Sequence, residues 1–182
     1  MSGIPEIPKR MRTLERDPRG YPIPYIVMRD ANGRPHFTIN AYDRVKAAIR
    51  RKTCGICGYR LRESYWFVGG KKCFTEPNGA FLDPAMHREC AEFALQTCPY
   101  LALPSYNKRI DDRTLSPDAM PQGASIIGHV EVPDERPDVF GLGNTKSYRV
   151  VDDMPGALVI VPGPWRYVEF WRHGAPVMRT EP

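Results

Sequence analysis

The stretch Cys54-Gly-Ile-Cys57-Gly58, together with the later His87-Arg-Glu-Cys90, decides how this chain folds. Two residues separate the donors of each pair, so both members can reach one point from a tight turn or from the start of a helix. The glycines of the first stretch permit the turn and leave backbone N–H groups free to bond the sulfurs. Three thiolates and one imidazole suit a tetrahedral zinc ion at about 2.0–2.3 Å. The spacing therefore predicts a structural zinc site at Cys54, Cys57, His87 and Cys90.

The segment between the two ligand pairs predicts a β-hairpin followed by a helix. Ser64–Val68 and Ala80–Leu82 are rich in strand-forming residues and flank a loop of Gly, Pro and Asn. Asp83 is a typical N-cap, and Pro84 suits the first helical position, where no hydrogen-bond donor is lost. A helix over 85–97 would then carry the second ligand pair on one face.

This order of elements resembles the treble-clef group of zinc fingers, in which a CxxC knuckle precedes a β-hairpin and a helix whose start contributes the last two ligands. The resemblance covers about residues 54–98 and rests on Cys54, Cys57, His87 and Cys90. It implies a zinc-stapled hairpin–helix unit. The wider sequence is similar to proteins of phages and high-GC bacteria that carry the phrases CGxCG and PxMHxEC, and this similarity brings no activity with it.

The chain has five cysteines, of which Cys73 is interpreted as a bystander and Cys98 as a core residue. An iron–sulfur cluster at Cys54, Cys57, Cys73 and Cys90 is an alternative, although the usual cluster spacings are missing. An odd cysteine count fits metal ligands better than a disulfide framework. Because the N-terminus lacks a secretory signal and the longest aliphatic run is too short to span a membrane, we expect a cytoplasmic protein.

The whole sequence predicts an α+β protein in which the treble-clef-like zinc module is flanked by β-hairpins. The 19 prolines and 15 glycines argue against a helix bundle. Hydrophobic residues at 42% and charged residues at 26% are typical of a globular chain. We predict an extended basic arm over 1–24, a β-hairpin and basic helix over 25–52, the zinc module over 53–99, and an irregular connection with a C-terminal β-rich part over 100–182, packed on the same domain.

The N-terminal hairpin is predicted by Asn32-Gly33, which lies between the β-rich runs 25–29 and 35–39. Both residues of such a pair tolerate positive φ, as a two-residue turn requires. Asn40 then predicts an N-cap and a helix over 41–52. This helix would bury the apolar side chains of Val45, Ala48 and Ile49.

The C-terminal part predicts several strands and one tight turn. The strands are expected over 125–132, 146–151, 157–161 and 165–171, with a final turn at His173-Gly174. Its aromatic residues Trp165, Phe170 and Trp171 admit two interpretations: a second small core, or the contact surface of a protein–protein adaptor.

Charge is unevenly distributed along the chain. Residues 1–52 carry 12 Lys/Arg and 5 Asp/Glu, a net charge of +7, whereas the remaining residues carry 14 and 16, a net charge of −2. This asymmetry predicts nucleic-acid binding through the basic N-terminal third, with affinity that falls as salt rises. Tyr59, Tyr65 and Trp66 are expected to stack on bases. The predicted contact residues are Arg44, Lys46, Arg50, Arg51, Lys52, Arg60, Lys71 and Lys72, with Arg62 beside them.

Catalysis is not expected from this sequence. HNH-type nucleases share the treble-clef frame but need a general-base histidine on the hairpin, and no histidine lies between Arg60 and Leu82. A zinc ion with four protein ligands has no open position for water. His36, His129 and His173 are isolated in the sequence. The acidic pairs Asp111-Asp112 and Asp152-Asp153 are interpreted as solvated.

Overall fold

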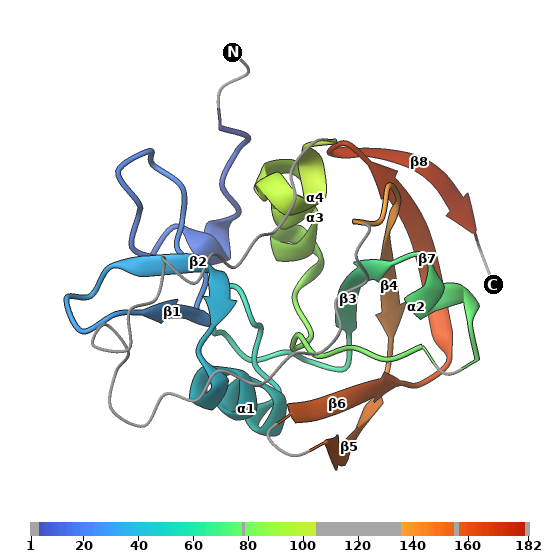
Figure 1. Ribbon diagram of the computed structural model, residues 1–182. Helices are drawn as coiled ribbons and strands as arrows, with labels where there is room; N and C mark the ends of the chain where they lie inside the picture. Colours follow the sequence, from blue (N-terminus) through green and yellow to red (C-terminus); the bar gives the residue numbers. More distant parts are fainter. Residues whose placement is uncertain (1–3, 78, 105–135, 155–156, 181–182) are drawn as a thin grey trace.

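The computed structural model describes residues 4–77, 79–104, 136–154 and 157–180. Its strands form three antiparallel sheets beside a few short helices, so the chain is a mixed α and β protein, as predicted (Figure 1). No helix in these ranges is long and apolar enough to cross a bilayer. The elements in chain order are η1 (Lys9–Met11), β1 (Val27–Arg29), β2 (Pro35–Asn40), α1 (Tyr42–Arg51), β3 (Tyr65–Gly70), α2 (Lys72–Thr75), α3 (Arg88–Thr97), α4 (Pro99–Ala102), β4 (Phe140–Thr145), β5 (Tyr148–Met154), β6 (Ala157–Pro162), β7 (Trp165–Arg172) and β8 (Ala175–Thr180).

The largest sheet has the strand order β3-β4-β7-β8, and β1-β2 and β5-β6 form two further two-stranded sheets. Successive side chains of a strand point to opposite faces. Trp66 and Tyr167 are both paired with Asn144, so they share one face, where the Arg88 guanidinium of α3 lies over both rings. Phe67 is paired with Gly143 on the other face, which α2 covers.

Strand β3 does not form the predicted hairpin with 80–82. That segment makes only the isolated bridge between Phe81 and Ile160, while β3 pairs along its whole length with β4. The physical reason is burial: the three consecutive residues from Tyr65 to Phe67 are each at most 9% exposed. A strand whose side chains are buried on both faces belongs to a sheet that is covered on both sides, and β3 is the edge strand of such a sheet. The hairpin of a treble clef is therefore absent in the form that the sequence predicted.

Helix α2 packs closely against β4 because two residues of β4 are glycines. A Cβ atom at Gly141 would lie 2.3 Å from Cδ2 of Phe74, and one at Gly143 would lie 2.6 Å from Cε1 of the same ring. The Phe74 ring therefore lies directly on the β4 backbone. Its centroid is 4.9 Å from that of Trp165 and 5.3 Å from that of Phe81. This aromatic cluster joins α2 to β7 and to the segment at Phe81, which is bridged to Ile160 of β6.

The N-terminal hairpin forms as predicted, with β1 antiparallel to β2 and Gly33 at a φ of 79°. Helix α1 also forms, and it buries the three predicted residues Val45, Ala48 and Ile49. Its N-cap is Ala41 rather than Asn40. The Asn40 side chain instead donates a hydrogen bond to Asp83 Oδ1 at 2.7 Å, so tertiary contact replaces the predicted local cap.

The described part of the predicted basic arm, residues 4–24, packs against the domain. Met11 of η1 is 1% exposed and Ile23 is 4% exposed. Arg10 pairs with Glu89 of α3 at 2.8 Å, and Arg19 pairs with the buried Asp17 at 2.7 Å. Part of the positive charge of this segment is therefore neutralised within the molecule.

The C-terminal strands confirm three of the four predicted strand positions as β5, β6 and β7. The predicted turn is present, because His173 and Gly174 have φ values of 49° and 79° between β7 and β8. Phe170 and Trp171 are 4% and 5% exposed, which argues against a contact surface, and Trp171 belongs to the same hydrophobic core as Phe67 and Leu95 rather than to a second small core. The predicted strand over 125–132, Asp111-Asp112 and His129 lie outside the described residues.

We expect the substitution Gly143→Ala to lower the free energy of unfolding by about 1–3 kcal/mol, because the new methyl group overlaps the Phe74 ring. Urea unfolding followed by tryptophan fluorescence measures the change. Gly70→Ala is the matched control, since its Cβ would lie no closer than 3.2 Å to Pro137, and the expected change is within about 1 kcal/mol. Equal losses in the two variants would contradict the packing described for Phe74.

Candidate metal centre

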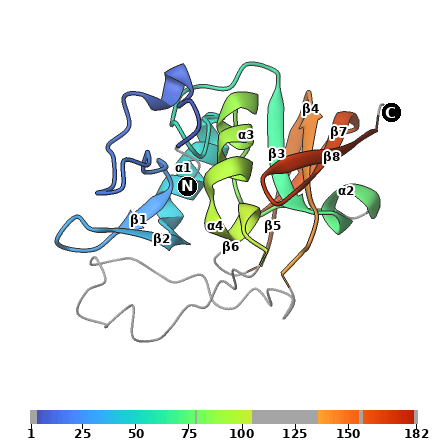
Figure 2. The ribbon, with the colours of Figure 1, turned by 90° about the horizontal axis from the view of Figure 1, so that it is seen from above.

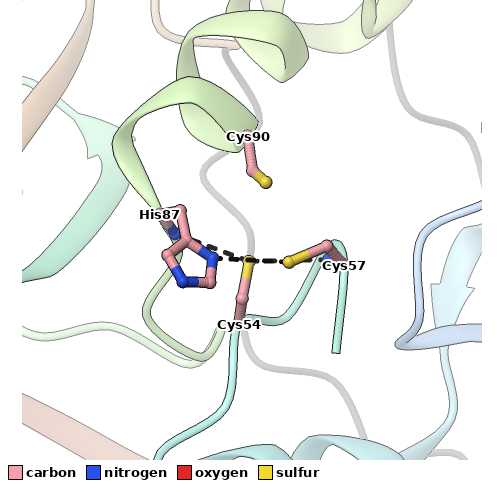
Figure 3. A group of neighbouring side chains, drawn as sticks. All are labelled: Cys54, Cys57, His87 and Cys90. Atoms are coloured by element: carbon pink, nitrogen blue, oxygen red, sulfur yellow. Dashed lines mark hydrogen bonds between the residues drawn. The ribbon is translucent and has the colours of Figure 1, made fainter. Parts of the chain in front are cut away.

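The four residues that the spacing selected lie together. Cys54 and Cys57 occupy the turn after α1, while His87 is the N-cap of α3 and Cys90 lies in its first turn. Their donor atoms all lie within 4.8 Å of one another, and they form a group that can hold a metal ion. Figure 3 shows the four side chains pointing toward one another. The three cysteines are buried and the histidine is partly exposed.

The ligand helix begins later than predicted, at Arg88 rather than at residue 85. Met86 exchanges backbone hydrogen bonds with Trp66 of β3 at 2.8 and 3.2 Å, so the chain is still extended there. The predicted cap Asp83 accepts a hydrogen bond from Asn40 instead. As a result, His87 has an extended ψ of 153° at the N-cap, and its ring meets the cysteine turn directly.

Backbone hydrogen bonds hold the cysteine turn, residues 54–59, within itself and to two neighbouring segments. Within the turn, Cys54 N–H donates to Tyr59 O at 2.8 Å and Gly58 N–H donates to Cys54 O at 2.9 Å, with Gly58 at a φ of 75°. From the hairpin side, Ile26 N–H donates to Gly55 O at 3.2 Å. From the helix side, Gly55 N–H donates to Ala85 O at 3.1 Å. The turn therefore joins the N-terminal hairpin to the approach of α3.

The sulfur of Cys54 and the ring of His87 are oriented by groups around them. Backbone N–H groups of Cys57 and His87 both donate to Cys54 Sγ at 3.5 Å. His87 Nδ1 lies 3.3 Å from Cys57 Sγ, while Nε2 lies 3.3 Å from Arg60 O. A carbonyl can only accept, so Nε2 carries the proton and Nδ1 is the nitrogen directed at the metal position.

Protons hold the cluster together when no metal is bound. Burial alone would raise the pKa of the Cys54 thiol, but hydrogen bonds from Cys57, Cys90 and His87 outweigh burial and hold this pKa well below its usual value. The same contacts with Cys54 and Cys57 raise the pKa of His87 to about 10. Hydrogen bonds to those two sulfurs, together with burial, raise the pKa of Cys90. These shifts favour a thiolate at Cys54 that accepts hydrogen bonds from its neighbours.

The remaining cysteines lie elsewhere. Cys73 belongs to α2, and its side chain contacts the far end of β3 at Gly69. Burial raises the pKa of its thiol. Cys98 lies at the junction of α3 and α4. An iron–sulfur set that includes Cys73 does not match the group of donors observed in the described part of the chain.

The predicted nucleic-acid contacts separate into different places. Arg44 donates to Tyr25 O at 3.0 Å, and Lys46 pairs with Asp43 at 3.1 Å, so both are engaged within the molecule. Lys71 and Lys72 begin α2. Figures 1 and 2 both show α2 on the opposite side of the molecule from α1.

The other predicted cations gather around the cysteine turn. Arg50 and Arg51 end α1, and Lys52 is its C-cap. Lys52 O accepts a hydrogen bond from Leu61 N–H at 2.8 Å, and Thr53 forms a bridge with Arg60. The end of α1 and the segment 60–62 therefore lie side by side.

Two further cations, Lys146 and Arg149, come near this region, although the sequence did not predict them as contact residues. Tyr148 OH donates to Ile49 O at 2.9 Å, which places the start of β5 near the end of α1. Thr145 pairs with Tyr65, so Lys146 follows directly beside the start of β3. We define the basic surface as the exposed residues Arg50, Arg51, Lys52, Arg60, Arg62, Lys146 and Arg149.

Aromatic residues of the predicted stacking set are mostly in the core. Tyr65 is 5% exposed and Trp66 is 9% exposed, so neither can stack on a base, which corrects the prediction. Tyr59 is 47% exposed.

Comparison of the chain with protein-family models, with curated proteins and with solved structures finds no match.

We expect binding of one divalent metal ion at neutral pH to release at least two protons. His87 and Cys90 are protonated in the metal-free cluster, because the pKa of each is raised above its usual value, and both must lose a proton to become ligands. Calorimetric titration in buffers of different ionisation enthalpy measures the number. Release of less than one proton per ion would contradict this assignment.

Proposed function

We propose that Cys54, Cys57, His87 and Cys90 bind one structural zinc ion. The observation that carries this proposal is the convergence of three buried sulfurs and one oriented imidazole nitrogen within 4.8 Å. Zinc prefers such a set of soft and borderline donors, whereas magnesium and calcium prefer oxygen. Four protein ligands complete a tetrahedral shell, which leaves no position for a reacting water. The ion would therefore stabilise the fold rather than catalyse a reaction.

The proposed ion would add a direct link between two segments that already meet in the core. Its ligands come from the cysteine turn and from the start of α3, which are separated in sequence and share few backbone hydrogen bonds. A preformed site is absent from an unfolded chain, so binding free energy becomes folding free energy. The N-terminal hairpin depends on the same turn through Tyr25 and Ile26, whose N–H groups donate to Ile56 O and Gly55 O.

We expect the purified protein to contain one equivalent of zinc and Cys57→Ser to lose it, with a marked fall in melting temperature. Cys73→Ser is the matched control, because Cys73 lies in α2 away from the donor group, and it should keep the zinc. Elemental analysis, thermal unfolding and X-ray absorption at the zinc edge, with three sulfurs and one nitrogen as the expected shell, measure these outcomes. Wild-type protein without stoichiometric metal would overturn the proposal.

We propose further that the protein binds nucleic acid through the basic surface. Its seven residues are exposed, and none forms an ion pair with an acid in the part of the chain that the structure describes. Some arginines elsewhere are paired, for example Arg10 with Glu89 and Arg29 with Glu15, whereas others, such as Arg34 and Arg166, form no ion pair with a described residue. Glu63 is the acid that shares the loop with Arg62. The unpaired positive charge supports contact with phosphate groups.

Helix stabilisation accounts for only some of these cations. Positive side chains in a last turn favour the helix dipole, which explains Arg50 and Arg51 without any ligand. Arg60, Lys146 and Arg149 belong to other segments and gain nothing from that dipole. The Thr53 bridge places Arg60 beside the end of α1, and Lys146 and Arg149 lie on either side of Tyr148, which bonds Ile49 O; this proximity along the backbone supports a shared role in binding an anionic polymer.

We expect Arg51→Ala/Arg60→Ala to weaken nucleic-acid binding and to reduce the slope of log affinity against log salt by up to about 1.8, or about 0.9 for each phosphate that the variant no longer neutralises. Lys71→Ala/Lys72→Ala removes the same charge from the opposite side of the molecule and should leave the slope unchanged. Fluorescence anisotropy over a salt series measures both. Equal effects in the two variants would show that net charge, rather than this surface, determines binding.

A further inference from the structure

The basic surface offers cations without a row of aromatic rings. Tyr65 packs edge-on against Tyr148, with ring centroids 4.9 Å apart. Trp66 donates through Nε1 to Ser64 Oγ at 3.2 Å, and the Arg88 guanidinium lies 5.1 Å from the centre of its ring. Both rings therefore pack inside the fold and present no face on which a base could stack. Among the described residues of this region, Tyr59 is left as the exposed aromatic side chain, at 47% exposure.

The remaining tyrosine is also restrained. Tyr59 OH lies 3.3 Å from Thr13 Oγ, so the N-terminal segment holds the end of its ring. Its backbone belongs to the cysteine turn, where Tyr59 O accepts from Cys54 N–H at 2.8 Å. One restrained ring cannot provide the successive stacking positions by which proteins hold the bases of a single strand.

The cations themselves are carried by fixed backbone. Arg50 and Arg51 extend from the last turn of α1, Arg60 from a segment bonded to Lys52 and Thr53, and Lys146 from the end of β4. A rigid set of positive groups matches a rigid set of phosphates better than a flexible strand. Double-stranded nucleic acid also presents one charge per about 1.7 Å of axis, twice the density of one strand.

We propose that the basic surface binds the phosphate backbone of a duplex rather than the bases of a single strand. This inference rests on the proposed nucleic-acid binding and names the form of nucleic acid that the same surface binds. Contacts to phosphates fix a protein on a duplex without reading its sequence, so binding is expected to depend weakly on sequence. DNA and RNA duplexes share this chemistry, and separate arms of the experiment distinguish them.

The test compares zinc-loaded full-length protein on a duplex DNA, a duplex RNA and each constituent single strand, all of about 20 nucleotides, in about 50 mM salt. We expect at least one duplex to bind about tenfold more tightly than its strands, because the strands have half the charge density and gain no stacking. Lys146→Ala/Arg149→Ala should weaken duplex binding by about tenfold or less, while Tyr59→Ala should change it less than about twofold. Zinc content and circular dichroism verify the fold of each variant.

The outcomes separate the two proposals. Single strands that bind as tightly as both duplexes, or a loss of more than about tenfold in Tyr59→Ala, would overturn the duplex inference and leave nucleic-acid binding intact. Absence of binding to every nucleic acid in low salt would overturn the proposed function itself, and the inference with it.

Discussion

The convergence of Cys54, Cys57, His87 and Cys90 is the constraint on which the arrangement of the chain depends. The four donor atoms lie within 4.8 Å of one another although they come from two distant segments. The cysteine turn must therefore face the start of α3, and α3 must begin at the residue where His87 can point back. Hydrogen bonds from the N-terminal hairpin on one side and from Ala85 on the other follow from that placement.

The second organising contact is the pairing of β3 with β4. It places α3 on one face of the large sheet and α2 on the other, since Trp66 and Phe67 point to opposite sides. The glycines of β4 let the Phe74 ring reach the backbone, and the buried Glu169 of β7 accepts hydrogen bonds from Tyr167 and Trp171. Among the described residues, every buried polar side-chain atom has a hydrogen-bond partner.

The distribution of paired and unpaired cations follows from the same arrangement. The N-terminal segment packs on the domain, so Arg10 reaches Glu89 and Arg19 reaches Asp17. Arg50, Arg51 and Lys52 form no ion pair with a described residue, and Lys146 and Arg149 lie on either side of Tyr148, which bonds Ile49 O. Of the cations in residues 1–52, only Arg50, Arg51 and Lys52 therefore belong to the basic surface, and the others of that surface come from later segments.

Features that depend on local chemistry could be predicted from the sequence. The donor spacing selected all four members of the metal centre, Asn32-Gly33 and His173-Gly174 marked two hairpin turns, and the apolar spacing marked the buried face of α1. Each of these depends on residues close together in the chain, whose conformation is determined by their own sterics and donors. The partner of β3, the start of α3 at Arg88 and the contact of Tyr148 with α1 depend on contacts between distant segments. Several strands of similar composition compete for such contacts, and only the packing of the whole interior selects among them.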